Sequence, residues 1–273
     1  MSSTLRALVV AVLSCFCLLV GVPAASAADD DPPVVGYDVS HPQCDVPLPD
    51  RPAFGIVGVN GGRATRPNPC LTEQLAWAAG ATGAVRGQPG LQLYVNTANP
   101  GQLLDVVHTW PLAGDSPYGH CDGVNDEACS WRYGWLRAYL DVEAFFAPAA
   151  ERAGVDPDPA AHRWWLDVET MNTWQYGSPA AQARNRAALE GMTAYLDSRG
   201  AEVGLYSTAQ QWGRIVGDVP RDSALYGLDS WLAGGGTPAG ARATCRRAPL
   251  VGGGEVVMAQ YVEDRLDHNH PCG

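Results

Sequence analysis

The residues best suited to chemistry are two carboxylates two positions apart, Asp167 and Glu169. They close the apolar segment 164–169, which predicts a buried strand. Side chains alternate along a strand, so both point the same way, with Cα atoms about 6.6–6.8 Å apart. Repulsion and partial burial then raise one pKa, leaving a protonated acid beside an ionised partner, as glycosidic bond cleavage requires. The alternative is that arginines pair with both carboxylates at the rim of the fold.

Other polar and aromatic residues stand at or near the ends of further expected strands. Asp38 closes the first strand, and Tyr206, Trp231, Gln260 and Asp267 lie on or beside later ones. Aromatic rings beside carboxylates suit the apolar faces and hydroxyl rims of sugars. Taken singly, each of these residues is more often part of a core or a cap than a ligand-binding residue.

Short apolar strands alternate with helical stretches along the chain. The expected strands are 34–40, 54–59, 91–95, 164–169, 202–207, 229–233 and 256–261. The expected helices are 71–85, 131–153, 180–199 and 208–216. This alternation predicts an α/β fold with a parallel sheet covered by helices, and at this length a TIM-like (modified β/α) barrel fits best. Carboxyl ends of the strands would then meet at one mouth.

The first 27 residues have the pattern of a secretion signal. Arg6 precedes an apolar run over residues 7–22, and Ala25-Ser26-Ala27 matches a cleavage site. The apolar run is too short for a spanning helix, and no later segment is longer. We therefore expect a secreted protein whose residues 28–273 form one barrel domain, with no stable membrane association.

The charge balance excludes several classes of partner. The chain has 18 arginines, no lysine and a formal net charge of −11, and removal of Arg6 with the signal makes it −12. Such a charge repels nucleic acids and anionic lipid surfaces, so neither is expected as a partner. We expect a monomer that acts on a polysaccharide.

The cysteines predict structural disulfides. Six of the eight lie beyond the signal, and six allow fifteen pairings in an oxidising compartment. Proximity along the chain favours Cys44–Cys70, Cys121–Cys129 and Cys245–Cys272, each worth roughly 2–4 kcal/mol. No C-x-x-C pair indicates zinc or redox chemistry.

No motif indicates a cofactor or a serine nucleophile. The glycine runs 234–236 and 252–254 lack the lysine and the strand–helix setting of a phosphate loop, and the chain has no G-x-S-x-G elbow. His268 and His270, beside Asp267, form an H-x-H edge that needs a third metal ligand from elsewhere. A loop tied down by Cys272 is the favoured interpretation, so no metal is expected.

Four motifs resemble those of the family 25 glycoside hydrolases, the Chalaropsis-type lysozymes. Residues 38–43, D-V-S-H-P-Q, resemble the opening strand, and Asp167-Val168-Glu169 resembles the D-x-E strand. Gln260-Tyr261 and the D-x-N of residues 267–269 resemble the closing elements. The order and approximate spacing agree over nearly the whole chain after the signal.

The resemblance implies a modified barrel that cleaves the β-1,4 bond between N-acetylmuramic acid and N-acetylglucosamine in peptidoglycan. Glu169 would be the general acid, and Asp167 would stabilise an oxazolinium-like intermediate. Asp38 and Asp267 would be supporting acids, with Tyr206 near the acetamido group.

The chain departs from the family pattern at two strand ends. Asn60-Gly61-Gly62 stands where the family usually has a lysine-containing K-A-T-E-G segment, and residues 94–97 differ from the family's Y-H-F. A cysteine-bearing insertion follows the third strand. A barrel that binds glycans without cutting them is the alternative function, since a negative chain repels an anionic wall.

Overall fold

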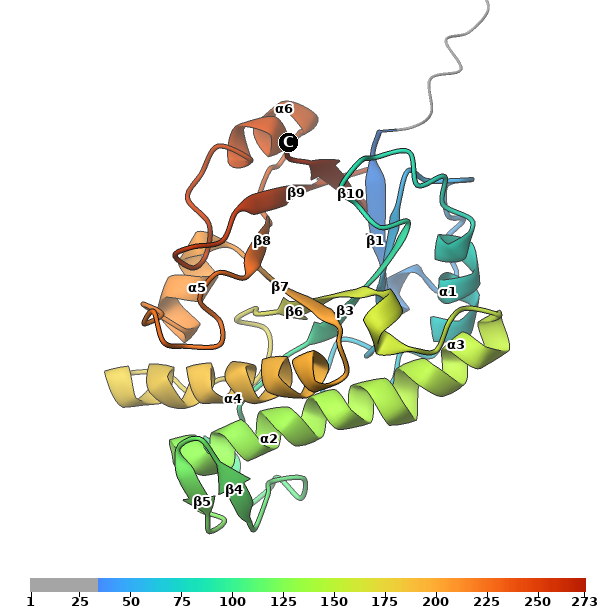
Figure 1. Cartoon of the computed structure of the whole chain (residues 1–273). Helices are drawn as coiled ribbons and strands as arrows, with labels where there is room; N and C mark the ends of the chain where they lie inside the picture. Colours follow the sequence, from blue (N-terminus) through green and yellow to red (C-terminus); the bar gives the residue numbers. More distant parts are fainter. Residues whose placement is uncertain (1–33) are drawn as a thin grey trace, which may run out of the picture. The chain divides into compact units, whose positions relative to one another are not determined.

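Eight strands close into a barrel in the part of the chain that the computed structural model describes, residues 34–273 (Figure 1). The TIM-like α/β barrel is thus confirmed, and the described residues belong to one compact unit. The barrel strands are β1 (Gly36–Val39), β2 (Gly55–Gly58), β3 (Leu91–Asn96), β6 (Arg163–Asp167), β7 (Glu202–Ser207), β8 (Asp229–Leu232), β9 (Val256–Glu263) and β10 (Leu266–Pro271). The expected signal segment, residues 1–27, lies outside the described residues.

The barrel is not parallel throughout, because its last strand is reversed. Around the barrel the strands follow the order β1-β10-β9-β8-β7-β6-β3-β2, and β10 pairs antiparallel with both β1 and β9. The loop expected around His268 and His270 is therefore wrong, because both residues lie on β10. Asp264 and Arg265, with φ of 51° and 66°, make a two-residue turn between β9 and β10. That backbone geometry favours glycine or asparagine, so the two residues present give little sign of a hairpin.

The alternation of side chains along each strand decides which residues face the barrel interior. On β6, Trp164 and Leu166 belong to the main core that includes helix residues, whereas Trp165 belongs to the cluster inside the barrel. Trp231 and Met258 fill the same interior cluster. Asp167, two residues beyond Trp165, therefore faces the interior at the carboxyl end of β6.

Helices pack around the barrel, and their bounds differ from expectation in places. They are α1 (Leu71–Ala79), α2 (Glu127–Leu140), α3 (Ala147–Ala153), α4 (Pro179–Ser198), α5 (Ala209–Ile215) and α6 (Pro238–Thr244). The expected helix 71–85 stops at Ala79, because the N–H groups of Thr82 and Gly83 bond to carbonyls of residues 52 and 53 instead. The expected helix 131–153 begins earlier, at α2, and passes through a π-helical segment, Asp141–Phe146, into α3.

Helices α2 and α4 run side by side along one flank of the barrel (Figure 1). Two glycines permit the close approach: a Cβ on Gly134 would lie 1.8 Å from the Ala188 carbonyl oxygen, and one on Gly191 would lie 2.0 Å from the Trp131 carbonyl oxygen. A short hairpin that the sequence did not predict, β4 (Gly114–Ser116) and β5 (Gly119–Cys121), contacts α2. Residues of the insertion after β3 are thereby fixed against the helical flank.

All three expected disulfides are present: Cys44–Cys70, Cys121–Cys129 and Cys245–Cys272. They tie the loop after β1 to the start of α1, the hairpin to α2, and the end of α6 to β10. Within residues 34–273 no helix is long and apolar enough to cross a membrane.

Candidate active site

A cavity of about 300 Å³ opens at the carboxyl ends of the parallel strands, and we call it the carboxylate pocket. The structure brings together in it every site residue singled out from the sequence. Its lining is Asp38, Tyr94, Asp167, Glu169, Tyr206, Trp231, Gln260 and Asp267. Tyr94 was missed, although its position on β3, two residues before the buried strand end Asn96, is the signal that points it inward.

The reversal of β10 explains how Asp267 reaches this pocket. Because β10 is antiparallel to its neighbours, its first residues lie at the mouth, and Asp267 is paired in register with Asp38 of β1. Asn269, two residues further along β10, is fully buried beneath them. Strand β10 therefore supplies a carboxylate to the pocket and an amide that hydrogen-bonds to Asp38 beneath it.

Asp38 is held by three hydrogen bonds from buried amides. Gln260 Nε2 donates to both carboxylate oxygens at 3.1 and 3.0 Å, and Asn269 Nδ2 donates to Oδ1 at 2.6 Å. The Tyr206 hydroxyl donates in turn to Gln260 Oε1 at 2.8 Å. This chain of donors fixes the orientation of Asp38, and sequence reasoning did not assign Asn269 a place in it.

Burial raises the pKa of three carboxyls in the pocket, Asp38, Asp167 and Asp267. Desolvation, followed by the charges of Glu169 and Asp38, raises the pKa of Asp167 well above its usual value. Desolvation and the charge of Asp267 raise the pKa of Asp38, although the amide hydrogen bonds oppose this. Asp167 Oδ1 is buried without a hydrogen-bond partner. Burial therefore shifts Asp167 toward its protonated form, and not toward the ionised form implied by its expected role beside a general acid at Glu169.

Glu169 occupies a different environment from Asp167. It lies beyond the end of β6 and is half-buried, and Gln211 Nε2 donates to its Oε1 at 3.4 Å. Asp267 is also half-buried, and desolvation raises its pKa. None of the ion pairs in the described part of the chain includes Asp38, Asp167, Glu169 or Asp267. The alternative of an arginine-paired rim therefore has no support in the structure.

Aromatic residues line the carboxylate pocket beside its four acids. Trp231 is 1% exposed, and its ring lies 4.3 Å from that of Tyr206 and 5.8 Å from that of Trp165, between centroids. A ring covered in this way presents no open face on which a sugar can stack. Trp231 therefore contributes a low-dielectric floor beneath the carboxylates, and Tyr206 and Tyr94 form the walls.

Comparison with solved structures identifies the architecture. A muramidase from Trichobolus zukalii and a family GH25 lysozyme from Aspergillus fumigatus each superpose with a TM-score of 0.51 and 16% identity, over 88% of this chain and 94% of theirs. The chain has the fold of a GH25 lysozyme. No family model matches this GH25-like chain. Lysozyme-like protein 5 of Caenorhabditis elegans is 43% identical over 53 residues, which are 19% of this chain and 22% of the relative's length.

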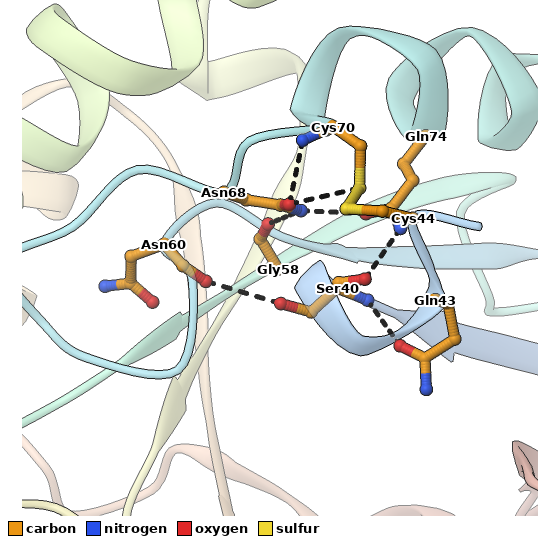
Figure 2. The surroundings of a disulfide bond; sticks show 8 residues. All are labelled: Ser40, Gln43, Cys44, Gly58, Asn60, Asn68, Cys70 and Gln74. Atoms are coloured by element: carbon orange, nitrogen blue, oxygen red, sulfur yellow. Dashed lines mark hydrogen bonds between the residues drawn. A yellow bond between two sulfur atoms is a disulfide. The ribbon is translucent and has the colours of Figure 1, made fainter. Parts of the chain in front are cut away.

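A disulfide lies beside the loop after β1 of the GH25-like barrel (Figure 2). Cys44–Cys70 joins the loop after β1 to the start of α1. Beside it, Gln74 Nε2 donates to the Ser40 carbonyl at 2.7 Å, and Asn68 Nδ2 donates to Gln74 Oε1 at 2.7 Å. These contacts hold the loop after β1, which lines a second cavity of about 180 Å³ sharing all four carboxylates with the first.

His268 and His270, considered above as a possible metal-binding pair, are part of strand β10 of the GH25-like barrel. His268 lies on β10, where its ring packs against Tyr37 and Tyr261 with centroids 4.7 and 4.9 Å away. His270 is paired in register with Ala259 of β9. Among residues 34–273 no group of three or more His, Cys, Asp or Glu side chains is arranged to hold a metal ion.

Proposed function

We propose that the protein is a glycoside hydrolase that cleaves the β-1,4 bond between N-acetylmuramic acid and N-acetylglucosamine in peptidoglycan. The observation that carries this proposal is the group of four carboxylates at the mouth of a lysozyme-like barrel, without a cationic partner among the described residues. Structural ion pairs do not explain such a cluster, and buried carboxyls with raised pKa values are typical of catalytic sites.

In this proposal Glu169 is the general acid. It is more exposed than Asp167, so it can meet the oxygen of the scissile bond. As the bond between that oxygen and the anomeric carbon breaks, the oxygen receives the Glu169 proton and leaves as a hydroxyl. Water later adds to the anomeric carbon and returns a proton to Glu169, which restores the starting state.

Asp167 is proposed to offset the positive charge that develops on the sugar and its acetamido group. A cation close to a carboxyl lowers its pKa, so the developing charge draws Asp167 from the protonated form into the ionised form. The charge of Glu169 is one cause of the raised pKa of Asp167, so the two carboxyls interact electrostatically. The buried, poorly solvated position of Asp167 makes its attraction to the developing cation stronger than it would be in water.

Asp38 and Asp267 are proposed to support the sugar at the same mouth. The amides of Gln260 and Asn269 hold Asp38 without neutralising it, so an oxygen stays available for a substrate hydroxyl or amide. Tyr206 is proposed to lie near the acetamido group. We also propose that residues 1–27 direct secretion, since three disulfides are stable in an oxidising compartment. Residues 28–273 are proposed to act as a monomer.

Digestion of purified peptidoglycan tests this function directly. We expect new reducing ends, and after borohydride reduction and acid hydrolysis the reduced sugar should be muramitol, as cleavage on the reducing side of N-acetylmuramic acid requires. New glucosaminitol instead would assign the other glycosidic bond. If no reducing ends form while soluble glycan fragments still bind, the non-catalytic alternative is correct.

A further inference from the structure

A third cavity, of about 350 Å³, continues the groove beyond the carboxylate pocket. Gly62, Met171 and Asn172 line both this cavity and the one that contains the carboxylates, so the spaces adjoin. We call it the arginine pocket, after Arg63 in its wall. Its other walls come from the insertion after β3 and from Tyr133 of α2.

The charge of the arginine pocket is opposite to that of its neighbour. Its lining includes Arg63 and contains no aspartate or glutamate. Arg63 is exposed, and its side chain makes no ion pair or hydrogen bond with the rest of residues 34–273. The chain as a whole has a net charge of −11 and repels anions. At this site, however, the Arg63 side chain, unpaired within the described residues, attracts an anion.

The walls of the arginine pocket are built and held by hydrogen bonds. Two backbone hydrogen bonds stabilise the loop that carries Arg63. Gly61 N–H donates to the Arg66 carbonyl at 2.8 Å, and Arg66 N–H donates to the Arg63 carbonyl at 3.1 Å. Across the pocket, Asn99 N–H donates to the Thr173 carbonyl at 2.8 Å and so joins the insertion to the loop after β6. The pocket therefore exists before any ligand arrives.

Gly62 keeps the passage between the two cavities open. Its φ is +68°, a conformation that side chains disfavour, and a Cβ there would lie 2.6 Å from His41 Cε1. At the lip, Met171 is 92% exposed and offers an apolar contact. These features suit an extended chain of sugars that lies across both cavities.

We propose that the arginine pocket binds an N-acetylmuramic acid unit further along the same glycan chain, and that Arg63 pairs with the lactyl carboxylate of that unit. This inference rests on the proposed function, and it names Arg63 as the residue that recognises the acidic substituent of the glycan. The inference also explains how a negatively charged chain can bind an anionic wall. The acidic groups gather at the carboxylate pocket, and the anionic substituent binds at the other end of the groove.

Binding measurements on the full chain test this inference with two probes of equal length. One is the tetrasaccharide of alternating N-acetylglucosamine and N-acetylmuramic acid with free lactyl carboxylates, and the other is the neutral chitin tetramer. At low ionic strength, R63Q should weaken calorimetric affinity for the acidic probe by roughly 2–5-fold, as expected for an exposed ion pair. The neutral probe should be unaffected, and added salt should remove the difference.

R66Q is the matched control, because Arg66 lies in the same exposed loop but does not line the pocket. The inference is overturned if R63Q weakens both probes equally or neither, if R66Q has the same effect as R63Q, or if neither probe binds. Failure of the proposed function is a separate result. Selective loss of the acidic probe in R63Q, in a protein that releases no sugar ends, would keep this binding site and remove the hydrolase.

Discussion

The two ends of the groove differ in what positions their charged groups. At the carboxylate pocket, acids from β1, the end of β6 and β10 are brought together over an aromatic floor, and burial raises the pKa of Asp38 and Asp167. At the arginine pocket, loops hold one exposed guanidinium. Buried charge suits chemistry, because it responds strongly to charge developing on a substrate, whereas exposed charge contributes selectivity with little effect on folding. The predictions below separate these contributions.

The largest expected effect is on turnover when the proposed acid is removed. Glu169→Gln keeps shape and hydrogen bonding but cannot donate the proton, so kcat should fall by roughly 10²–10⁴-fold. Glycan affinity should remain, since the arginine pocket is untouched. Glu151→Gln, on the exposed face of α3, is the control and should retain full activity. Equal turnover in the two variants would remove Glu169 from the mechanism.

The second-largest effect is expected from removing the Cys121–Cys129 disulfide, which should lower both the stability of the chain and the selectivity of the arginine pocket. Cys121 and Cys129 pack with Tyr133 in one small cluster, and Tyr133 lines the pocket. Replacing both cysteines with serine should lower the free energy of unfolding by roughly 2–4 kcal/mol, measured by denaturant titration.

This double variant should also reduce the preference for the acidic tetrasaccharide. Replacing Cys245 and Cys272 with serine should destabilise the chain by a similar amount and leave that preference intact, because this disulfide joins α6 to β10. If both double variants lose the preference equally, the pocket responds to global stability alone.

A smaller effect is expected from releasing Asp38. Asn269→Leu removes the 2.6 Å hydrogen bond to its carboxylate at nearly constant volume. A hydrogen bond to a charged group contributes roughly 1.5–3 kcal/mol, so kcat should fall by about 10–100-fold if Asp38 must be ionised. Because that bond lowers the pKa of Asp38, the acid limb of the pH–rate profile should also move to higher pH. A lower kcat with an unmoved profile would mean that Asn269 has a structural role only.

The smallest effect is a gain in stability. Because the pKa of Asp167 is raised on folding, its contribution to stability is present below its unfolded value near 3.8 and is lost as pH rises through the folded value. Asp167→Asn should therefore be more stable than the wild type at neutral pH, by roughly 0.5–2 kcal/mol, and should lose this advantage below pH 3.8. Thermal unfolding at both pH values measures it, with Asp105→Asn, at an exposed site, as the control. A pH-independent difference would contradict the assignment.

Much of the barrel followed from patterns that neighbouring residues carry. Apolar strands alternating with helices predicted the barrel, and the position of Asp167 and Glu169 at the end of an apolar strand predicted two acids at the mouth. Proximity of cysteines predicted the three disulfides. These inferences succeed because strand period and short loop closure depend on residues close in the chain.

Tertiary structure alone decided the rest. The reversal of β10, which carries Asp267 and Asn269 to Asp38, depends on a turn at Asp264 and Arg265 that lacks the usual glycine. The arginine pocket combines loops from distant parts of the sequence. The charge state favoured at Asp167 depends on desolvation by surrounding elements, which no local pattern records. Burial and pocket shape arise from contacts between residues far apart in the chain, so they become visible only when the barrel is closed.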